Sequence, residues 1–247
     1  MDRALYIAAQ GANQNMNSIS IHSNNLANVK TTGFKADLEQ ARSMQAYGEG
    51  LPTRVFAMTE RPAQNFDGGS LISTGRPLDV AISGDGWFSV QAADGSEAYT
   101  RSGGLKVAAS GVLENGSGRM IVGDGGPIIV PVPFQKIEIG KDGTVSALPA
   151  GAPANAMEVV GRIKMVNPEY KDMTKGTDGL FRMKDGSIAD ESVDTSLVSG
   201  FLEGSNVNAV GEMTGLISLQ RQFEMQVQIM KTLEEMDSAS TSLLSLQ

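Results

Sequence analysis

Apolar residues near the beginning of the chain recur at intervals of three and four positions. This spacing predicts an amphipathic α-helix that precedes residue 23, with one apolar face. The predicted face consists of Leu5, Ala8, Ala12, Met16 and Ile19. Because Ala8 and Ala12 are small, they would let a partner helix come close.

A stronger apolar stripe lies near the end of the chain and predicts a second helix, from about Ala209 to near Asp237. Its members are Met213, Leu216, Ile217, Gln220, Phe223, Val227, Met230 and Leu233. The large apolar side chains of this stripe would contribute on the order of 10–20 kcal/mol if fully buried. Such helices usually pack on the core of their own domain. Here the helices lie at opposite chain ends, so we expect them to pack on each other, on copies of the chain, or on both.

The middle of the chain is rich in residues that break helices. All nine prolines lie between Pro52 and Pro168, and 24 of the 29 glycines lie in residues 36–201. Short apolar runs separated by Asp-Gly turns predict strands of a sandwich, a barrel or an irregular β domain. The predicted strands are 78–82, 87–91, 98–101, 105–107, 120–122, 128–132, 137–139, 159–166 and 180–183.

Together these patterns predict an α+β fold. The N- and C-terminal helices would pair as a coiled-coil-like inner domain, and the middle of the chain would form a central β-rich domain. The predicted divisions are a helical assembly segment at 1–35, a connector at 36–66, the β-rich domain at 67–201 and a second helical assembly segment at 202–247.

The first predicted helix is followed by an unusual string, SNNLANVKTTGFK, at residues 23–35. Asparagine side chains can satisfy backbone groups where a helix ends, and Gly33 can supply a turn with positive φ. The string EGSNVNAV at 203–210 has the same character before the second helix. We predict that both strings form a fixed joint; its residues are Asn24, Asn25, Asn28, Thr32, Gly33, Phe34, Gly204, Asn206 and Asn208.

Charge and composition exclude several classes of protein. The net charge of −8 argues against nucleic-acid binding, and the absence of cysteine excludes disulfides and cysteine-based metal sites. No apolar run approaches the ~20 residues needed to cross a bilayer, so we predict no direct membrane insertion. The N-terminus lacks the apolar core of a signal peptide. The chain is therefore expected to be cytosolic or exported by a route without a cleaved signal.

The sequence offers few residues for catalysis. His22 is the only histidine, which argues against Ser-His-Asp, Cys-His and zinc arrangements. The glycine-rich segment 116–126 lacks a Walker lysine and the G-x-G-x-x-G spacing. The central acids adjoin glycine, where aspartate normally bonds turn backbone; they are Asp85, Asp94, Asp124, Asp142, Asp178 and Asp185. We predict no catalytic residue, no cofactor and no metal.

Three long motifs resemble one family of proteins. SNNLANVKTTGFK is similar to the N-terminal signature of the flagellar rod and hook family, and the segment 202–237 is similar to its C-terminal signature. The segment 74–107, TGRPLDVAISGDGWFSVQAADGSEAYTRSGGLKV, resembles the opening of the family's β domain. The resemblance covers nearly the whole chain, in order.

This resemblance implies a structural subunit of the flagellar basal-body rod, in its proximal part, and no enzymatic activity. The implied partners are copies of the chain, other rod subunits and the flagellar type III export apparatus. The terminal segments would fold fully on assembly into a tube that crosses the periplasm, transmits torque and carries exported subunits. The alternatives are a distal rod subunit and a secreted β-rich protein that binds or cleaves glycans, for which Trp87 and Tyr99 are the nearest aromatic candidates.

Overall fold

A computed structural model describes residues 2–45, 55–153 and 156–244. The chain divides into two compact units, which are described separately. The helical unit comprises Met1–Val29, Ala36–Asn65 and Val207–Gln247, and the β unit comprises Lys30–Lys35 and Phe66–Asn206. Two terminal helices and a β-rich middle confirm the predicted α+β class.

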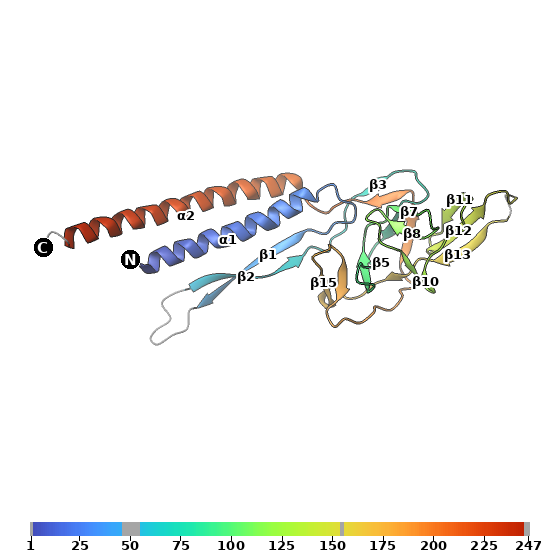
Figure 1. Ribbon diagram of the computed structural model, residues 1–247, viewed down its shortest axis with the longest axis horizontal. Coiled ribbons are helices and arrows are strands. Elements are labelled where there is room, and N and C mark those ends of the chain that lie inside the picture. The colour runs from blue at the N-terminus through green and yellow to red at the C-terminus, as the bar shows by residue number, and fades with distance from the viewer. Residues whose placement is uncertain (1, 46–54, 154–155, 245–247) are drawn as a thin grey trace. The chain divides into compact units, whose positions relative to one another are not determined.

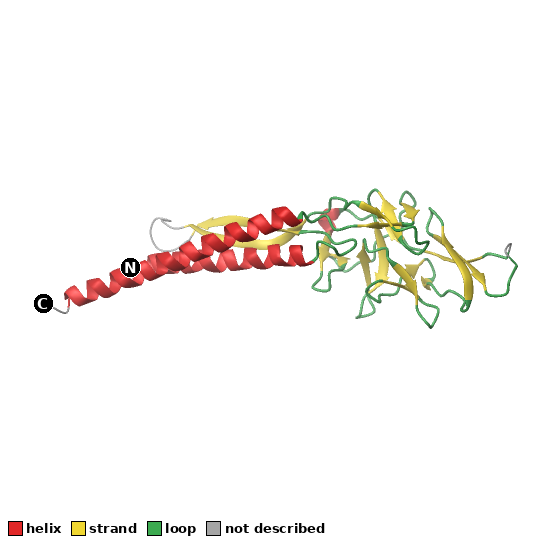
Figure 2. Cartoon of the chain, turned by 90° about the horizontal axis from the view of Figure 1, so that it is seen from above, coloured by secondary structure: helices red, strands yellow, loops and turns green. Residues whose placement is uncertain are grey.

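The helical unit contains the two long helices and a β-hairpin. Helix α1 (Asp2–Ala27) and helix α2 (Ala209–Leu244) lie side by side and run in opposite directions (Figures 1 and 2). Strand β1 (Asp37–Gln45) pairs antiparallel with β2 (Val55–Gln64), and both strands contact α1. Neither described helix combines the length and the apolar content that a bilayer-spanning segment requires.

The hairpin was not predicted from the sequence. Strand β1 reads DLEQARSMQ and contains none of the β-branched or aromatic residues that are enriched in strands. Its pairing with β2 and its contacts with α1 supply the order that local propensity does not.

The β unit is a set of short antiparallel sheets (Figure 1). A five-stranded sheet has the order β14-β5-β6-β16-β15, a three-stranded sheet has the order β11-β12-β13, and four further pairs join β17 to β4, β18 to β3, β7 to β8 and β10 to β9. The strands are β3 (Leu71–Ser73), β4 (Val80–Ser83), β5 (Trp87–Gln91), β6 (Glu97–Thr100), β7 (Leu105–Val107), β8 (Leu113–Asn115), β9 (Val122–Gly123), β10 (Gly126–Pro127), β11 (Phe134–Ile139), β12 (Thr144–Pro149), β13 (Glu158–Arg162), β14 (Met165–Val166), β15 (Met173–Lys175), β16 (Phe181–Met183), β17 (Ser196–Ser199) and β18 (Phe201–Glu203). A 3-10 turn at Tyr170–Asp172 precedes β15.

Most predicted strands overlap strands of the β unit, but the prediction for 128–132 is wrong. Ile128 and Val130 are buried, yet only a single bridge joins Ile129 to Val112. Pro131 has no N–H to donate to a ladder, so the apolar run packs into the core without forming a strand.

The β unit has its own core. The larger apolar cluster is built around Val80, Phe88, Leu105 and Ile121, which are at most 1% exposed. A smaller cluster contains Trp87, Tyr99, Phe181 and other residues. Because successive side chains of a strand point to opposite faces of the sheet, Trp87 of β5 and Tyr99 of β6 lie on the other face from Phe88. The β unit therefore needs neither terminal helix to bury its apolar side chains.

Candidate assembly surface and joint

Helices α1 and α2 approach each other through small residues. Ala8 and Ala12 are buried, at 5% and 6% exposure. A methyl group on Gly11 would lie 2.7 Å from the side-chain nitrogen of Gln226, and one on Gly215 would lie 3.2 Å from the ring of His22. The two helices therefore pack closely along a line that we call the helix seam.

The predicted apolar stripes divide between the helix seam and solvent. Besides Ala8 and Ala12, the half-buried members are Ile19, Leu216, Phe223, Met230 and Leu233. The exposed members are Leu5, Met16, Met213, Ile217 and Val227, all between 40% and 57% exposed. A single chain thus covers only part of each stripe.

Other exposed apolar side chains were missed by the sequence analysis. They are Tyr6, Ile7, Val210, Met225, Ile229 and Met236. Met225, Ile229 and Met236 are spaced by four and seven residues, which places them on one face of α2, away from the face of Phe223 and Met230. Only one apolar stripe was predicted for each helix, so the apolar residues on this second face of α2 were left out.

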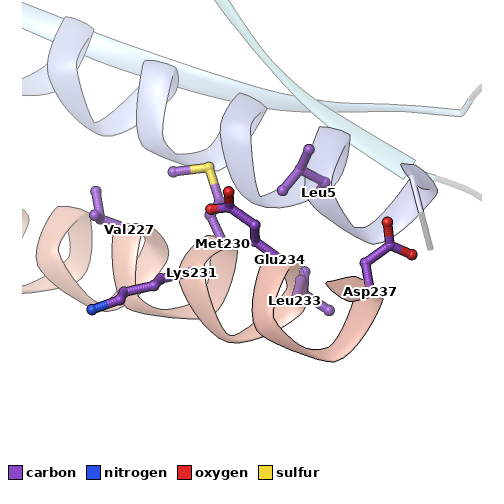
Figure 3. A pocket seen from close by; sticks show the side chains of 7 residues that line it. All are labelled: Leu5, Val227, Met230, Lys231, Leu233, Glu234 and Asp237. Carbon is purple, nitrogen blue, oxygen red and sulfur yellow. The ribbon is translucent and has the colours of Figure 1, made fainter. Parts of the chain in front are cut away.

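A groove of about 530 Å³ lies between the free ends of the two helices (Figure 3). Leu5 lines it from α1, and the α2 residues are Val227, Met230, Lys231, Leu233, Glu234 and Asp237. Its walls combine aliphatic side chains with an acidic rim, and nothing in it resembles a set of catalytic groups.

Glu203 is the centre of a buried ionic cluster in the β unit. Its Oε1 accepts hydrogen bonds from Lys35 Nζ at 2.7 Å and from the Gly69 N–H at 3.0 Å. Its Oε2 accepts a hydrogen bond from Arg101 Nη1 at 2.9 Å. The side chains of Glu203, Lys35 and Arg101 are only 3%, 0% and 4% exposed. The Glu203 cluster therefore joins the segment before α2 to the segment after α1.

Burial and charge act in opposite directions on the Glu203 cluster. Burial would raise the pKa of Glu203, but Arg101, Lys35 and the Gly69 N–H together lower this pKa below its ordinary value. Burial lowers the pKa of Lys35, and the neighbouring Glu203 offsets part of this effect. The carboxylate is the group that compensates both buried cations.

The predicted joint turns at Gly33, where φ is +71°. Its N–H donates a hydrogen bond to the carbonyl oxygen of Glu203 at 2.8 Å. A Cβ at this position would lie 2.3 Å from the carbonyl carbon of Arg101. The hydroxyl of neighbouring Thr32 lies 3.3 Å from that of Ser102. Only glycine fits both the backbone conformation and the space.

Phe34 and the return segment complete the joint within the β unit. Lys175 Nζ lies 4.1 Å from the centroid of the Phe34 ring, a cation–π contact. The Asn206 N–H donates to the Phe34 carbonyl at 3.3 Å, and the Gly204 N–H donates to the Ser70 carbonyl at 2.8 Å. The two predicted joint strings are therefore in direct contact.

Two of the predicted asparagines, Asn28 and Asn208, serve helix ends with their side chains. Asn28 Nδ2 donates to the carbonyl of Asn24 at 2.9 Å, in the last turn of α1. Asn208 Oδ1 accepts from the N–H groups of Val210 and Gly211, at 3.1 and 3.2 Å, and so caps the N-terminus of α2. These side chains satisfy backbone groups that a helix end leaves unpaired.

Asn25 lies inside the helical unit and is 2% exposed. Its amide forms two hydrogen bonds of 2.9 Å with the backbone of Asp37 on β1, and its Nδ2 lies 3.3 Å from Glu212 Oε1 on α2. His22 Nδ1 lies 2.5 Å from the other oxygen of Glu212. His22 was considered from the sequence only as a candidate catalytic group, and its contact with Glu212 was not predicted.

The described residues contain no arrangement that favours catalysis. Across 2–45, 55–153 and 156–244, no group of three or more His, Asp or Glu side chains could hold a metal ion. Trp87 and Tyr99 are 0% and 1% exposed, and the Tyr99 hydroxyl accepts a hydrogen bond from the Ala189 N–H at 2.7 Å. Neither ring is available to stack on a glycan.

Three family models match the chain in order. Residues 5–35 match the model described as flagella basal body rod protein, residues 81–147 match flagellar hook protein FlgE/F/G D1 domain, and residues 198–243 match flagellar basal body rod FlgEFG protein C-terminal. The outer two matches contain the two strings of the joint.

Whole-length relatives give the same assignment. The chain is 40% identical to the flagellar basal-body rod protein FlgF of Escherichia coli, with 100% of both chains covered. It is 34% identical to FlgF of Caulobacter vibrioides, over 99% of this chain and 98% of the relative. It is 33% identical to the rod protein FlgG of Agrobacterium fabrum, over 96% of this chain and 97% of the relative.

Proposed function

The chain belongs to the flagellar basal-body rod family, whose members are structural subunits of the rod, and we propose that it polymerises through its terminal helices. In this proposal the assembled helices form a tube that acts as the drive shaft, transmits torque and carries exported subunits. The 40% identity to FlgF of Escherichia coli supports a place in the proximal rod.

The observation that carries this proposal is the exposed apolar surface of the helical unit. Each helix buries one face against the other and leaves large apolar side chains in water on further faces. Met213, Ile217 and Val227 are all more than 40% exposed on α2. Exposed apolar surface of this kind favours association with another chain.

The proposed assembly interface is the set predicted from the two stripes. It comprises Leu5, Ala8, Ala12, Met16, Ile19, Met213, Leu216, Ile217, Phe223, Val227, Met230 and Leu233. The spacings of three and four residues on both helices support a coiled-coil-like pairing. The segments 1–35 and 202–247 would serve assembly, and the joint would fix where the chain enters and leaves the β-rich domain.

The proposed partners are copies of the chain, other rod subunits and the flagellar type III export apparatus. Passage through a narrow export channel requires an unfolded chain, which suits a protein without cysteine and with helices that are completed by neighbours. No cleaved signal peptide is needed in this proposal.

Complementation of a strain that lacks its own copy of the gene tests the proposed function. Replacing Met213, Ile217 and Val227 together with serine should abolish swimming, because the subunit loses apolar contacts while its β unit is unchanged. The matched control replaces Ile188 and Val193, which are 64% and 83% exposed on the β unit, with serine and should swim normally. Normal swimming of the triple variant, with parental amounts in isolated basal bodies, would contradict the proposal.

A further inference from the structure

A polar cluster lies where α1, α2 and β1 meet. His22 Nδ1 is 2.5 Å from Glu212 Oε2, and Asn25 Nδ2 is 3.3 Å from Glu212 Oε1. Asn25 also exchanges two hydrogen bonds with the backbone of Asp37. The side chains of His22 and Glu212 are 32% and 16% exposed. Glu212 thus joins α2 to α1, and Asn25 joins both helices to β1.

The remaining helix seam discriminates poorly between alternative registers. Ala8, Gly11 and Ala12 on α1 present a smooth surface, and no Asp, Glu, Lys or Arg occurs in residues 4–29. On α2, apolar residues recur at three and four positions, so a shift by one heptad again places apolar side chains on the seam. Small and repetitive contacts stabilise a helix pair without fixing its register.

A heptad shift would break the polar cluster. Gly11 lies against Gln226 and Gly215 lies against His22, which defines the observed register. If α2 moves so that Gly11 faces Leu233, Leu219 takes the place of Glu212 opposite His22. If α2 moves the other way, so that Gly11 faces Leu219, His22 lies beyond the first residue of α2. In either case Glu212 would lose its contacts with His22 and Asn25.

We propose that His22, Asn25 and Glu212 specify the register in which α1 and α2 pair. A polar group at a seam position is known to select register at some cost in stability. The register claim concerns the single chain; its consequence for the rod rests on the proposed function, because the exposed residues of both helices form one assembly surface only when the helices are aligned.

The absence of cysteine makes register directly measurable with engineered disulfides in the full chain. The pair Gly11→Cys with Gln226→Cys reports the observed register, because a Cβ at Gly11 already touches Gln226. Gly11→Cys with Leu219→Cys, or with Leu233→Cys, reports a shift by one heptad. The first pair should form at least tenfold more disulfide than either shifted pair.

Replacing Glu212 with leucine should lower the yield of the Gln226 pair relative to the Leu233 pair by about tenfold. The position facing His22 then holds an apolar residue in the observed register and also, as Leu219, in the register that the Leu233 pair reports. Glu212→Gln, which keeps two hydrogen-bonding groups, should restore most of the ratio. Glu224→Leu, at an exposed position of the same helix, is the matched control and should leave the ratio unchanged. A decrease in stability alone would lower all three disulfide yields together and would not change their ratio.

An unchanged ratio in Glu212→Leu would overturn the inference, as would a parent chain in which the shifted pairs form as readily as the first pair. Disulfide ratios decide the register, whereas complementation by the unsubstituted chain decides the proposed function. The failure of one is therefore distinguishable from the failure of the other.

Discussion

Removing the carboxylate of Glu203 should destabilise the β unit more than any other single charge deletion in the Glu203 cluster. Glu203→Ala leaves Lys35 and Arg101 buried without their shared anion, and their side chains are 0% and 4% exposed. Deleting one partner of a buried ion pair typically costs about 3–5 kcal/mol. With a urea m-value of about 2 kcal/mol/M, the unfolding midpoint should fall by about 1.5–2.5 M.

Trp87 supplies the assay. It is the only tryptophan, it is fully buried in the β unit, and the Arg101 guanidinium lies 5.4 Å from its ring. Its fluorescence therefore reports unfolding of the unit that contains the Glu203 cluster. The matched control is Glu138→Ala, because Glu138 forms an ion pair with Lys136 in which both side chains are more than half exposed.

The control should change the free energy of unfolding by about 0–1 kcal/mol, as is usual for exposed ion pairs. If Glu203→Ala changes it by no more than the Glu138→Ala control, the Glu203 cluster does not hold the joint together as described.

Three further predictions concern the joint and the turns. Gly33→Ala should destabilise the β unit by about 2–4 kcal/mol, whereas Gly75→Ala, with a similar φ and open space around it, should cost only about 1–2 kcal/mol in the same urea titration. Asn208→Ala should remove about 1 kcal/mol of helix stability, measured as faster amide exchange in the first turn of α2. Hydrogen bonds from Thr144 hold the pKa of Asp142 below its ordinary value. The stabilisation is therefore present above the ordinary pKa and should be lost as the pH falls through the lowered pKa, so the urea midpoints of the parent chain and Asp142→Asn, followed by Trp87 fluorescence, should differ at about pH 5 and converge towards about pH 2.

The sequence predicted those features that depend on local pattern. The second helix begins at Ala209 as expected, because Asn208 caps it and apolar residues follow at helical spacing. The Asp-Gly turns formed for the predicted reason: Asp142 and Asp185 accept hydrogen bonds from backbone N–H groups two residues on. The helix cap and the turns each depend on residues only a few positions apart, so both can be recognised in the sequence.

Features that depend on distant residues could not be predicted in the same way. Lys35, Arg101 and Glu203 are separated by at least 66 positions in the sequence and meet only because two chain segments pass through the β unit together. A lysine that follows a glycine turn gives no sign that it will be buried. The contact of His22 with Glu212, 190 positions away, has the same origin.

The hairpin formed by β1 and β2 was not predicted, for a different reason. Strand β1 is held by pairing with β2 and by contact with α1, while its own residues have low strand propensity. The outward-facing residues Met225 and Ile229 were missed because the strongest stripe was taken to be the whole apolar surface of the helix.

Labelling of a single engineered cysteine tests the central claim, assembly through the exposed helix surface, most directly. Ile217 is 55% exposed, so Ile217→Cys in the soluble chain should react rapidly with a maleimide, since the parent chain contributes no thiol. In isolated basal bodies the same cysteine should react at least about tenfold more slowly, because a neighbouring subunit covers it. Equal rates in the soluble chain and in basal bodies would contradict assembly through this surface.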